Sequence, residues 1–385
     1  MNEYIKLRAL LSNAGYGFVE PPVVHPASVF VELAGEELRR RLYLTSAEDG
    51  EELALRPDYT IPVCLHHLAT GVAKRKANYA YLGPVFRMRP GESGEFRQAG
   101  IESLGRTDRV AADADVLKLA FAVADLLGAK RAKVRIGDSA LFASLLDQLE
   151  LNEPWRRRLA RAFGDTRRLK GFIARANGRA KTSPPRSELE GAGIAAVRAA
   201  VEDHFLQTGL GAAGGRSADE IAERFVEKAA LAEGIPKKAA AALSAFLAIA
   251  GTPAKASAAL RSLAKREKVD LGKAIDRFEK RAEAFDAQGI DLARLTFAAD
   301  FGRRLDYYTG FVFEFQAKAG SEPVIGGGRY DRMTALIGDA KEAVPAVGFS
   351  VWLDRVAPSP SAPSSRRSQG AKPSPTRGEG KKVAS

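Results

Sequence analysis

Two adjacent tyrosines and an arginine stand out in residues 303–314, whose sequence is RRLDYYTGFVFE. The guanidinium of Arg303 can match a carboxylate with two parallel hydrogen bonds. Tyr308 offers a hydroxyl that can bind a ring nitrogen, and Tyr307 can supply an aromatic wall. Thr309-Gly310 is typical of a turn. The segment therefore predicts a strand-turn-strand site for a small molecule that carries a carboxylate, namely an amino acid.

Polar residues recur at regular spacing on two further segments with strand character, 79–87 and 96–104. Arg87 ends the first segment, and Gln98 and Glu102 lie four residues apart in the second. We expect these segments to pair as antiparallel strands. Taken alone, the spacing fits a ligand-binding face and also a solvated face of the sheet.

Three consecutive glycines, 326–328, precede Arg329-Tyr330-Asp331. Glycine permits close approach of the backbone to a ligand or to another strand. Taken alone, the motif favours a tight turn.

The elements that would position these residues mix helices and strands. Apolar spacing predicts a helix at 3–14, and Asp113 can cap another helix that ends at Gly128. The strands expected on period-two or β-rich grounds are 40–44, 52–56, 79–87, 96–104, 133–136, 295–301 and 311–315. We expect Thr309-Gly310 to join the last two strands. The pattern predicts an α+β fold in which an antiparallel sheet is flanked by helices.

Residues from about 139 to 290 differ from the rest of the chain in composition and pattern. Ala, Leu, Arg and Lys dominate at helical spacing, and strand signals nearly vanish. We interpret this stretch as a helical insertion in a domain that spans 1–356. A Ser217…Glu220 capping box begins one of its helices. The G-x-G-x-x-G pattern at 209–214 follows a helix and not a strand, so a helix–helix connection is a better interpretation than a dinucleotide site.

The formal net charge is +12, and its distribution is uneven. Residues 151–186 carry a net charge of +9 and residues 357–385 carry +5, so the rest of the chain is close to neutral. We expect 357–385 to be a disordered basic tail, because it is rich in proline, serine and charge. The 151–186 region fits a solvated basic face, and also a surface for a partner or for RNA.

Several classes of protein do not fit this composition. One cysteine, Cys64, excludes an internal disulfide framework and fits a reducing cytoplasm. The four histidines show no metal-ligand spacing, so we expect no metal and no cofactor. The absence of a long apolar run argues against a membrane span, and the start of the chain shows no signal-peptide core. We therefore expect a cytoplasmic protein.

Taken in order, these segments resemble the class II histidyl-tRNA synthetases. Residues 55–60, LRPDYT, are similar to the Leu-Arg-Pro-Glu-Gly-Thr stretch of that family. Phe86-Arg87 and 96–105 are similar to motif 2, and 303–314 to the histidine-specific motif. Residues 327–331 and 348–355 resemble the region that leads into motif 3. The resemblance implies a class II synthetase fold over about 1–356, with a motif 1 dimer interface near the N-terminus.

The departures from this pattern fall on the nucleotide and tRNA parts of such an enzyme. Arg87-Met88-Arg89-Pro90 is one residue shorter than the motif 2 signature and lacks its glutamate. Tyr59 replaces a glycine, and Trp352 replaces the motif 3 glycine, where an indole would fill space that adenine needs. Thr309-Gly310 replaces Asn-Arg, and a 29-residue tail stands where a tRNA-reading domain is expected.

This combination resembles the regulatory subunits of ATP phosphoribosyltransferase, which are non-catalytic relatives of the synthetases. The resemblance implies a short-form catalytic partner, a role in the first step of histidine biosynthesis, and histidine as the feedback effector. It also implies a homodimer within a hetero-oligomer that binds no tRNA. The residues carried over to a histidine site, with no catalytic residue among them, are Asp58, Thr60, Arg87, Gln98, Glu102, Arg303, Tyr307 and Tyr308.

Each part of free histidine has expected partners in this set. Arg87 or Arg303 would bind the carboxylate, and Asp58, Gln98 and Thr60 would bind the ammonium. Glu102 with Tyr308 would bind the imidazole and select its tautomer. Other functions remain open: a shortened but active histidyl-tRNA synthetase, a paralogue that binds histidine or another amino acid, and an RNA-binding scaffold that uses 151–186.

Overall fold

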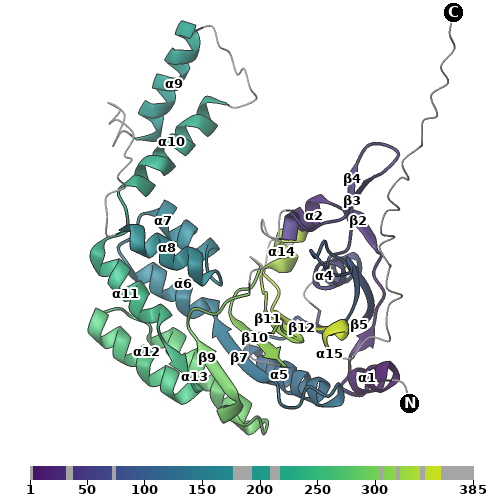
Figure 1. The fold of residues 1–385 in the computed structure, drawn as a ribbon. Helices are drawn as coiled ribbons and strands as arrows, with labels where there is room; N and C mark the ends of the chain where they lie inside the picture. The colour runs from purple at the N-terminus through teal and green to yellow at the C-terminus, as the bar shows by residue number, and fades with distance from the viewer. Residues whose placement is uncertain are drawn as a thin grey trace, which may run out of the picture.

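The computed structural model describes residues 3–31, 38–71, 75–176, 193–208, 217–303, 307–317, 321–338 and 343–356. Three features of the sequence lie outside these ranges: the glycine pattern at 209–214, the basic tail 357–385, and Arg304-Leu305-Asp306 within the tyrosine motif. The described chain forms a sheet-based core and a helical part beside it (Figure 1).

A nine-stranded sheet forms the centre of the core, in the order β1-β5-β6-β12-β11-β10-β7-β9-β8. Its pairs are antiparallel except β1 with β5 and β7 with β9. The strands are β1 Gly17–Phe18, β5 Ala77–Phe86, β6 Glu95–Leu104, β7 Lys133–Asp138, β8 Ala250–Gly251, β9 Leu295–Ala298, β10 Phe311–Gln316, β11 Ile325–Arg329 and β12 Ala346–Trp352. The expected pairing of the two polar-rich segments is present as the β5–β6 hairpin.

A small sheet and short helices cover one end of the central sheet. The three-stranded sheet has the order β2-β4-β3, with β2 Val24–Pro26, β3 Leu44–Ser46 and β4 Glu52–Leu55. The helices of the core are α1 Glu3–Asn13, α2 Ser28–Val31, α4 Thr60–Ala69, α5 Arg109–Leu126, α14 Met333–Ile337 and α15 Leu353–Val356.

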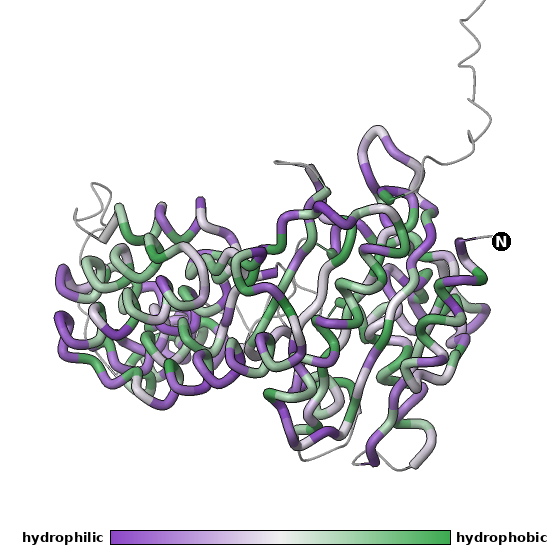
Figure 2. The backbone as a smooth tube through the Cα atoms, turned by 90° about the horizontal axis from the view of Figure 1, so that it is seen from below, coloured by the Kyte–Doolittle hydropathy of each residue, from purple (hydrophilic) through white to green (hydrophobic). Residues whose placement is uncertain are grey.

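The stretch between β7 and β9 is almost entirely helical among the described residues. Its elements are α6 Ser139–Gln148, α7 Glu153–Arg161, α8 Thr166–Ala176, α9 Ile194–Thr208, α10 Ala218–Ala232, α11 Lys237–Leu247, α12 Pro253–Glu267, α13 Gly272–Ala287 and the 3-10 helix Leu292–Arg294. The Ser217–Glu220 capping box at the start of α10 is confirmed. The α9–α10 pair projects away from the other helices (Figure 1). Seen from below, this part and the core form two lobes (Figure 2).

The alternation of β10 explains how the core supports a site. Phe311, Phe313 and Phe315 share one face, as their spacing predicts, and that face packs against helices. The Phe311 ring centroid lies 5.3 Å from Phe285 of α13, and the Phe315 centroid lies 4.9 Å from Phe121 of α5. The opposite face of β10 is therefore free to present side chains to a cavity.

Four local expectations were wrong. The strands 295–298 and 311–316 do not form a hairpin, because β7 pairs with both and lies between them. Glycines 326–328 form the middle of β11 and not a turn. Asp113 does not cap a helix, because α5 begins at Arg109 and Asp113 is fully buried inside it. The expected strand at 40–44 begins only at Leu44.

Candidate functional site

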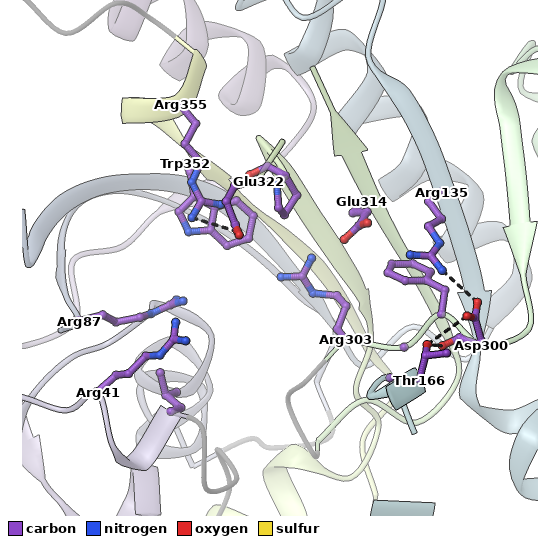
Figure 3. Close-up of a pocket in the computed structure, with 15 residues that line it drawn as sticks. Arg41, Arg87, Arg135, Thr166, Asp300, Arg303, Glu314, Glu322, Trp352 and Arg355 are labelled. Carbon is purple, nitrogen blue, oxygen red and sulfur yellow. Dashed lines mark hydrogen bonds and ion pairs between the residues drawn. The ribbon is translucent and has the colours of Figure 1, made fainter. Parts of the chain in front are cut away.

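A cavity of about 480 Å³ opens beside the ends of β5, β10 and β12. Figure 3 shows Arg41 and Arg87 pointing into it from one side, Arg303 from the other and Arg355 near its rim. The remaining polar lining consists of Arg135, Thr166, Asp300, Glu314 and Glu322. Arg135 pairs with Asp300 at 3.0 Å and Arg355 with Glu322 at 3.6 Å. The size suits a small ligand, and the concentration of guanidinium groups favours a carboxylate-bearing one.

Asp58 is a buried carboxylate directly before α4, with 3% of its surface exposed. Neither of its oxygens accepts a hydrogen bond of normal geometry within the described structure. Burial raises the pKa of Asp58, while Arg87, the backbone N–H groups of Ile61 and Thr60, and Arg303 act in the opposite direction. A buried acceptor without a partner leaves a place for a donor from a ligand, such as an ammonium group.

Gln98 is a second buried side chain without partners. It is 0% exposed, and neither its Nε2 nor its Oε1 atom has a hydrogen bond. On β6 it lies in register between Gly83 of β5 and Trp352 of β12. Asp58 and Gln98 thus have the property expected of ligand contacts, because buried polar atoms are rarely left unsatisfied in a folded protein.

Glu102 contacts hydroxyl groups of the protein itself. Its Oε1 atom accepts from the hydroxyl of Thr60 at 2.8 Å and from Tyr81 at 3.4 Å, and its Oε2 atom accepts from Tyr330. Burial is the main cause that raises the pKa of Glu102 to about 8. Burial thus favours the protonated form of this carboxyl group. Thr60, expected as a contact to the ammonium, is engaged with Glu102.

Two expected arginines reach the cavity. Arg87 donates from its Nε atom to the carbonyl of Pro57 at 2.6 Å, and burial lowers its pKa while Asp58 opposes the shift. Arg303 crosses the sheet above Gly326, where a Cβ atom would collide with its guanidinium. The Nε atom of Arg303 has no hydrogen bond. A side chain at this position of β11 would therefore require the Arg303 guanidinium to move.

Tyr307 and Tyr308 lie together at the edge of the site. Their ring centroids are 4.7 Å apart, and Tyr307 also meets Tyr330 edge-on at 5.9 Å. The Arg303 guanidinium lies 5.8 Å from the centroid of Tyr308. Arg303, Tyr307 and Tyr308 line a second cavity of about 570 Å³, which the core shares with α6 and α7. Arg303 therefore lines both cavities, and the two tyrosines line the second.

The eight expected residues thus meet around one region, but only Arg87 and Arg303 line the first cavity. Asp58, Gln98 and Glu102 are buried and do not line it. Tyr330 was not among the residues expected in the site. Its motif, Gly-Gly-Arg-Tyr-Asp, was noted in the sequence for its glycines. A local pattern does not reveal its bond to Glu102, because the two residues are 228 positions apart.

Aromatic side chains fill the region on the other side of the arginines. Trp352 is 5% exposed and packs in one apolar cluster with Tyr59, Tyr81, Phe96, Val63 and Val85. Tyr59 stacks on Tyr81 with a centroid distance of 4.5 Å, and the guanidinium of Arg56 lies 4.1 Å from the Tyr59 ring. Arg355 lies 4.9 Å and Arg303 lies 5.5 Å from the Trp352 ring. Tyr59 and Trp352, the two residues that replace glycines of the synthetase pattern, are therefore both buried.

Two negative observations concern the described residues only. They contain no group of three or more His, Cys, Asp or Glu side chains that could hold a metal ion. None of the helices described is long and apolar enough to cross a membrane.

Comparison with known proteins places this architecture in a class. The family model described as histidyl-tRNA synthetase matches residues 4–207 and 215–356, so the chain has the class II histidyl-tRNA synthetase domain. A histidine–tRNA ligase subunit from Alicyclobacillus acidocaldarius has a TM-score of 0.56 at 24% identity, and covers 92% of this chain and 90% of its own. A structure from Bacillus halodurans C, titled as an ATP phosphoribosyltransferase regulatory subunit/histidyl-tRNA synthetase, has a TM-score of 0.64 at 22% identity; the match covers 92% of this chain and 77% of that one. These structures confirm the expected α+β, class II synthetase-like fold.

Closer relatives define the family within that class. A protein from Mesorhizobium japonicum is 43% identical over 88% of this chain and 92% of its own length. A protein from Brucella ovis is 40% identical over 91% of this chain and 95% of its own. Both are named ATP phosphoribosyltransferase regulatory subunit. The chain belongs to this family of regulatory subunits, as the departures from the synthetase pattern predicted.

Proposed function

We propose that this chain is a non-catalytic, histidine-binding subunit that supports and regulates a short-form ATP phosphoribosyltransferase in the cytoplasm. That enzyme catalyses the first step of histidine biosynthesis. The family relationship supports the regulatory assignment. The observation that carries the ligand assignment is the pair of buried side chains, Asp58 and Gln98, whose polar atoms make no hydrogen bond of normal geometry, together with the two guanidinium groups that line the cavity.

Each part of a histidine molecule has a complementary group in this region. The carboxylate suits Arg87 and Arg303, and the ammonium suits Asp58 and Gln98, whose polar side-chain atoms make no hydrogen bond of normal geometry. The imidazole is assigned to Glu102 and Tyr308. Because Glu102 already accepts from Thr60 and Tyr330, a bound imidazole must share or displace one of these hydroxyl groups.

The aromatic cluster supports a role without catalysis. Trp352 and Tyr59 occupy volume where the synthetase pattern has glycines. A purine base would have to displace a buried indole and a buried phenol, each held by cation–π contacts. We therefore propose that the chain keeps amino-acid recognition and does not form an adenylate.

Regulation then follows from linkage. Histidine can bind one conformation of the subunit better than another. It then shifts the conformational equilibrium of the complex by no more than the difference between the two binding free energies, typically about 1–3 kcal/mol. The segment around Thr309-Gly310 is the proposed moving part. Glycines 326–328 are not proposed as a moving part, because they lie inside the sheet and pair with a strand on each side. We further propose a homodimer within a hetero-oligomer that binds no tRNA.

Calorimetry with L-histidine, on the chain alone and with a short-form catalytic subunit, tests the ligand assignment. We expect binding in at least one state; its absence in both would rule out histidine sensing. Co-purification and an activity assay with and without this chain test the partnership, and an unchanged rate with no complex would refute it. Histidine-dependent exchange of pyrophosphate into ATP would instead establish an active synthetase.

A further inference from the structure

Arg281 of α13 is a buried arginine, 4% exposed, that joins two carboxylates from different elements. Its Nε atom donates to Oδ2 of Asp113 in α5 at 2.9 Å. Its Nη1 atom donates to Oδ2 of Asp138, at the end of β7, at 2.7 Å. Charge-assisted bonds of this kind are strong and geometrically specific. Arg281 thus links α13 of the helical part to α5 and β7 of the core.

One route leads from Arg281 through Asp113 to the tyrosine motif. The Oδ1 atom of Asp113 accepts from Nε and Nη2 of Arg329 at 3.0 and 2.6 Å. Arg329 also donates to Asp331 at 2.8 Å, and its carbonyl accepts from the backbone N–H of Thr309 at 2.8 Å. The backbone N–H of Asp331 donates to the hydroxyl of Thr309 at 3.0 Å. This route ends on the residue that follows Tyr308.

A second route leads from Arg281 through Asp138 to the same turn. The Oδ1 atom of Asp138 accepts from the backbone N–H of Ala140 at 2.9 Å and so caps α6. The first residue of α6, Ser139, donates its backbone N–H to the carbonyl of Gly310 at 3.0 Å. Its hydroxyl donates to the same carbonyl at 3.3 Å. The first route therefore ends at Thr309 and the second at the neighbouring Gly310.

We propose that Arg281 is a positioning residue that couples α13 to the Tyr308 side of the ligand site. A displacement of α13 strains the bonds to Asp113 and Asp138 together, and the two routes end at adjacent residues, Thr309 and Gly310. The turn that carries Tyr308 therefore moves with the helical part of the chain. The effect on ligand affinity rests on the proposed histidine site, whereas the coupling of α13 to the turn does not. A protein partner that contacts the helical part would act through this arginine.

The test compares Arg281→Met with Arg281→Met/Asp138→Asn and with a control, Arg261→Met. The double variant removes the carboxylate charge that the single variant leaves buried, and asparagine still caps α6. Arg261 forms an exposed ion pair with Asp276 and Glu279 between α12 and α13, so the control removes an arginine from the same helix pair. Arg281→Lys keeps the charge and serves if the methionine variant fails to fold.

Three measurements are needed: histidine affinity by calorimetry, amide hydrogen exchange, and unfolding by urea. We expect Arg281→Met to weaken histidine about tenfold, within the usual range of coupling, and to speed exchange at Thr309 more than in β5. The double variant should regain stability but not affinity. A lysine variant should lie between wild type and Arg281→Met.

Two results would overturn the proposal. In the first, exchange at Thr309 changes no more than exchange in β5. In the second, the double variant restores both stability and affinity, which would mean that Arg281 only balances buried charge. If the wild-type chain binds no histidine, the proposed function fails, while the exchange measurement still decides whether Arg281 positions the turn.

Discussion

The carboxyl group of Glu102 accepts a hydrogen bond from the hydroxyl of Tyr330, and both residues are at most 1% exposed. Glu102 comes from β6, and Tyr330 directly follows β11, with β12 between the two strands. The Oε2 atom also lies so close to Gly348 of β12 that a Cβ atom there would collide with it. The carboxyl group is thus enclosed by three neighbouring strands. Contacts within the protein therefore hold this carboxyl group in place without a ligand.

Tyr330→Phe should destabilise the chain. The substitution removes one donor and leaves a buried Glu102 oxygen with a lost partner, which costs about 1–3 kcal/mol. Urea unfolding measures the loss. Tyr43→Phe is the matched control, because the Tyr43 hydroxyl makes no hydrogen bond within the described structure. Equal stability of the two variants would contradict the role of the Glu102–Tyr330 bond.

Stability should fall as the pH rises from about 4.5 to about 8. The pKa of Glu102 is raised to about 8 by burial, so the folded state binds its proton more tightly than the unfolded state does. The stabilising contribution is complete below the unfolded pKa and is lost as the pH passes through the folded value. The slope attributable to one such group reaches about 1.4 kcal/mol per pH unit. The raised pKa of Asp58 acts in the same direction.

Glu102→Gln isolates this effect, because glutamine has a similar shape and does not titrate. The difference in free energy of unfolding between wild type and Glu102→Gln should therefore decline between pH 5 and pH 8. Urea titrations at several pH values give that difference. A constant difference across this range would show that Glu102 does not titrate as proposed.

The parts of the fold that follow local rules could be predicted from the sequence. The alternation of Phe311, Phe313 and Phe315 placed these rings on one face, and that face packs as expected. The expected pairing of 295–301 with 311–315 was wrong because β7, from residues 133–138, lies between these two strands. Pairing is decided by contacts between distant segments, which the local pattern does not contain.

The same distinction applies to the site. The residue types that suit histidine could be chosen from motifs, and the structure brings them into one region. Asp113 was mistaken for a helix cap because aspartate is a good cap, and its true partners, Arg281 and Arg329, lie 168 and 216 positions away. The glycines of β11 looked like a turn because glycine disfavours strands, and the passage of Arg303 over Gly326 was not visible in the sequence.

Arg303→Met should weaken histidine binding by about tenfold or more, because a charge-assisted hydrogen bond contributes about 1.5–3 kcal/mol. Calorimetry measures the affinity. Arg135→Met is the matched control, since Arg135 lines the same cavity but already pairs with Asp300. An equal loss in both variants would indicate a general effect of positive charge and would contradict a direct contact from Arg303.

Trp352 should report the arrival of histidine by fluorescence. The chain has two tryptophans, and Trp155→Phe leaves Trp352 as the only one. The guanidinium of Arg303 lies 5.5 Å from the Trp352 ring and is proposed to bind the histidine carboxylate, so its movement on binding changes the environment of the indole. Titration of Trp155→Phe with histidine should therefore change the emission with the affinity that calorimetry gives. The complementary variant, Trp352→Phe, keeps Trp155, which packs against Phe172 in the helical part and should not respond. A silent Trp352 under conditions where calorimetry shows binding would place the carboxylate away from Arg303.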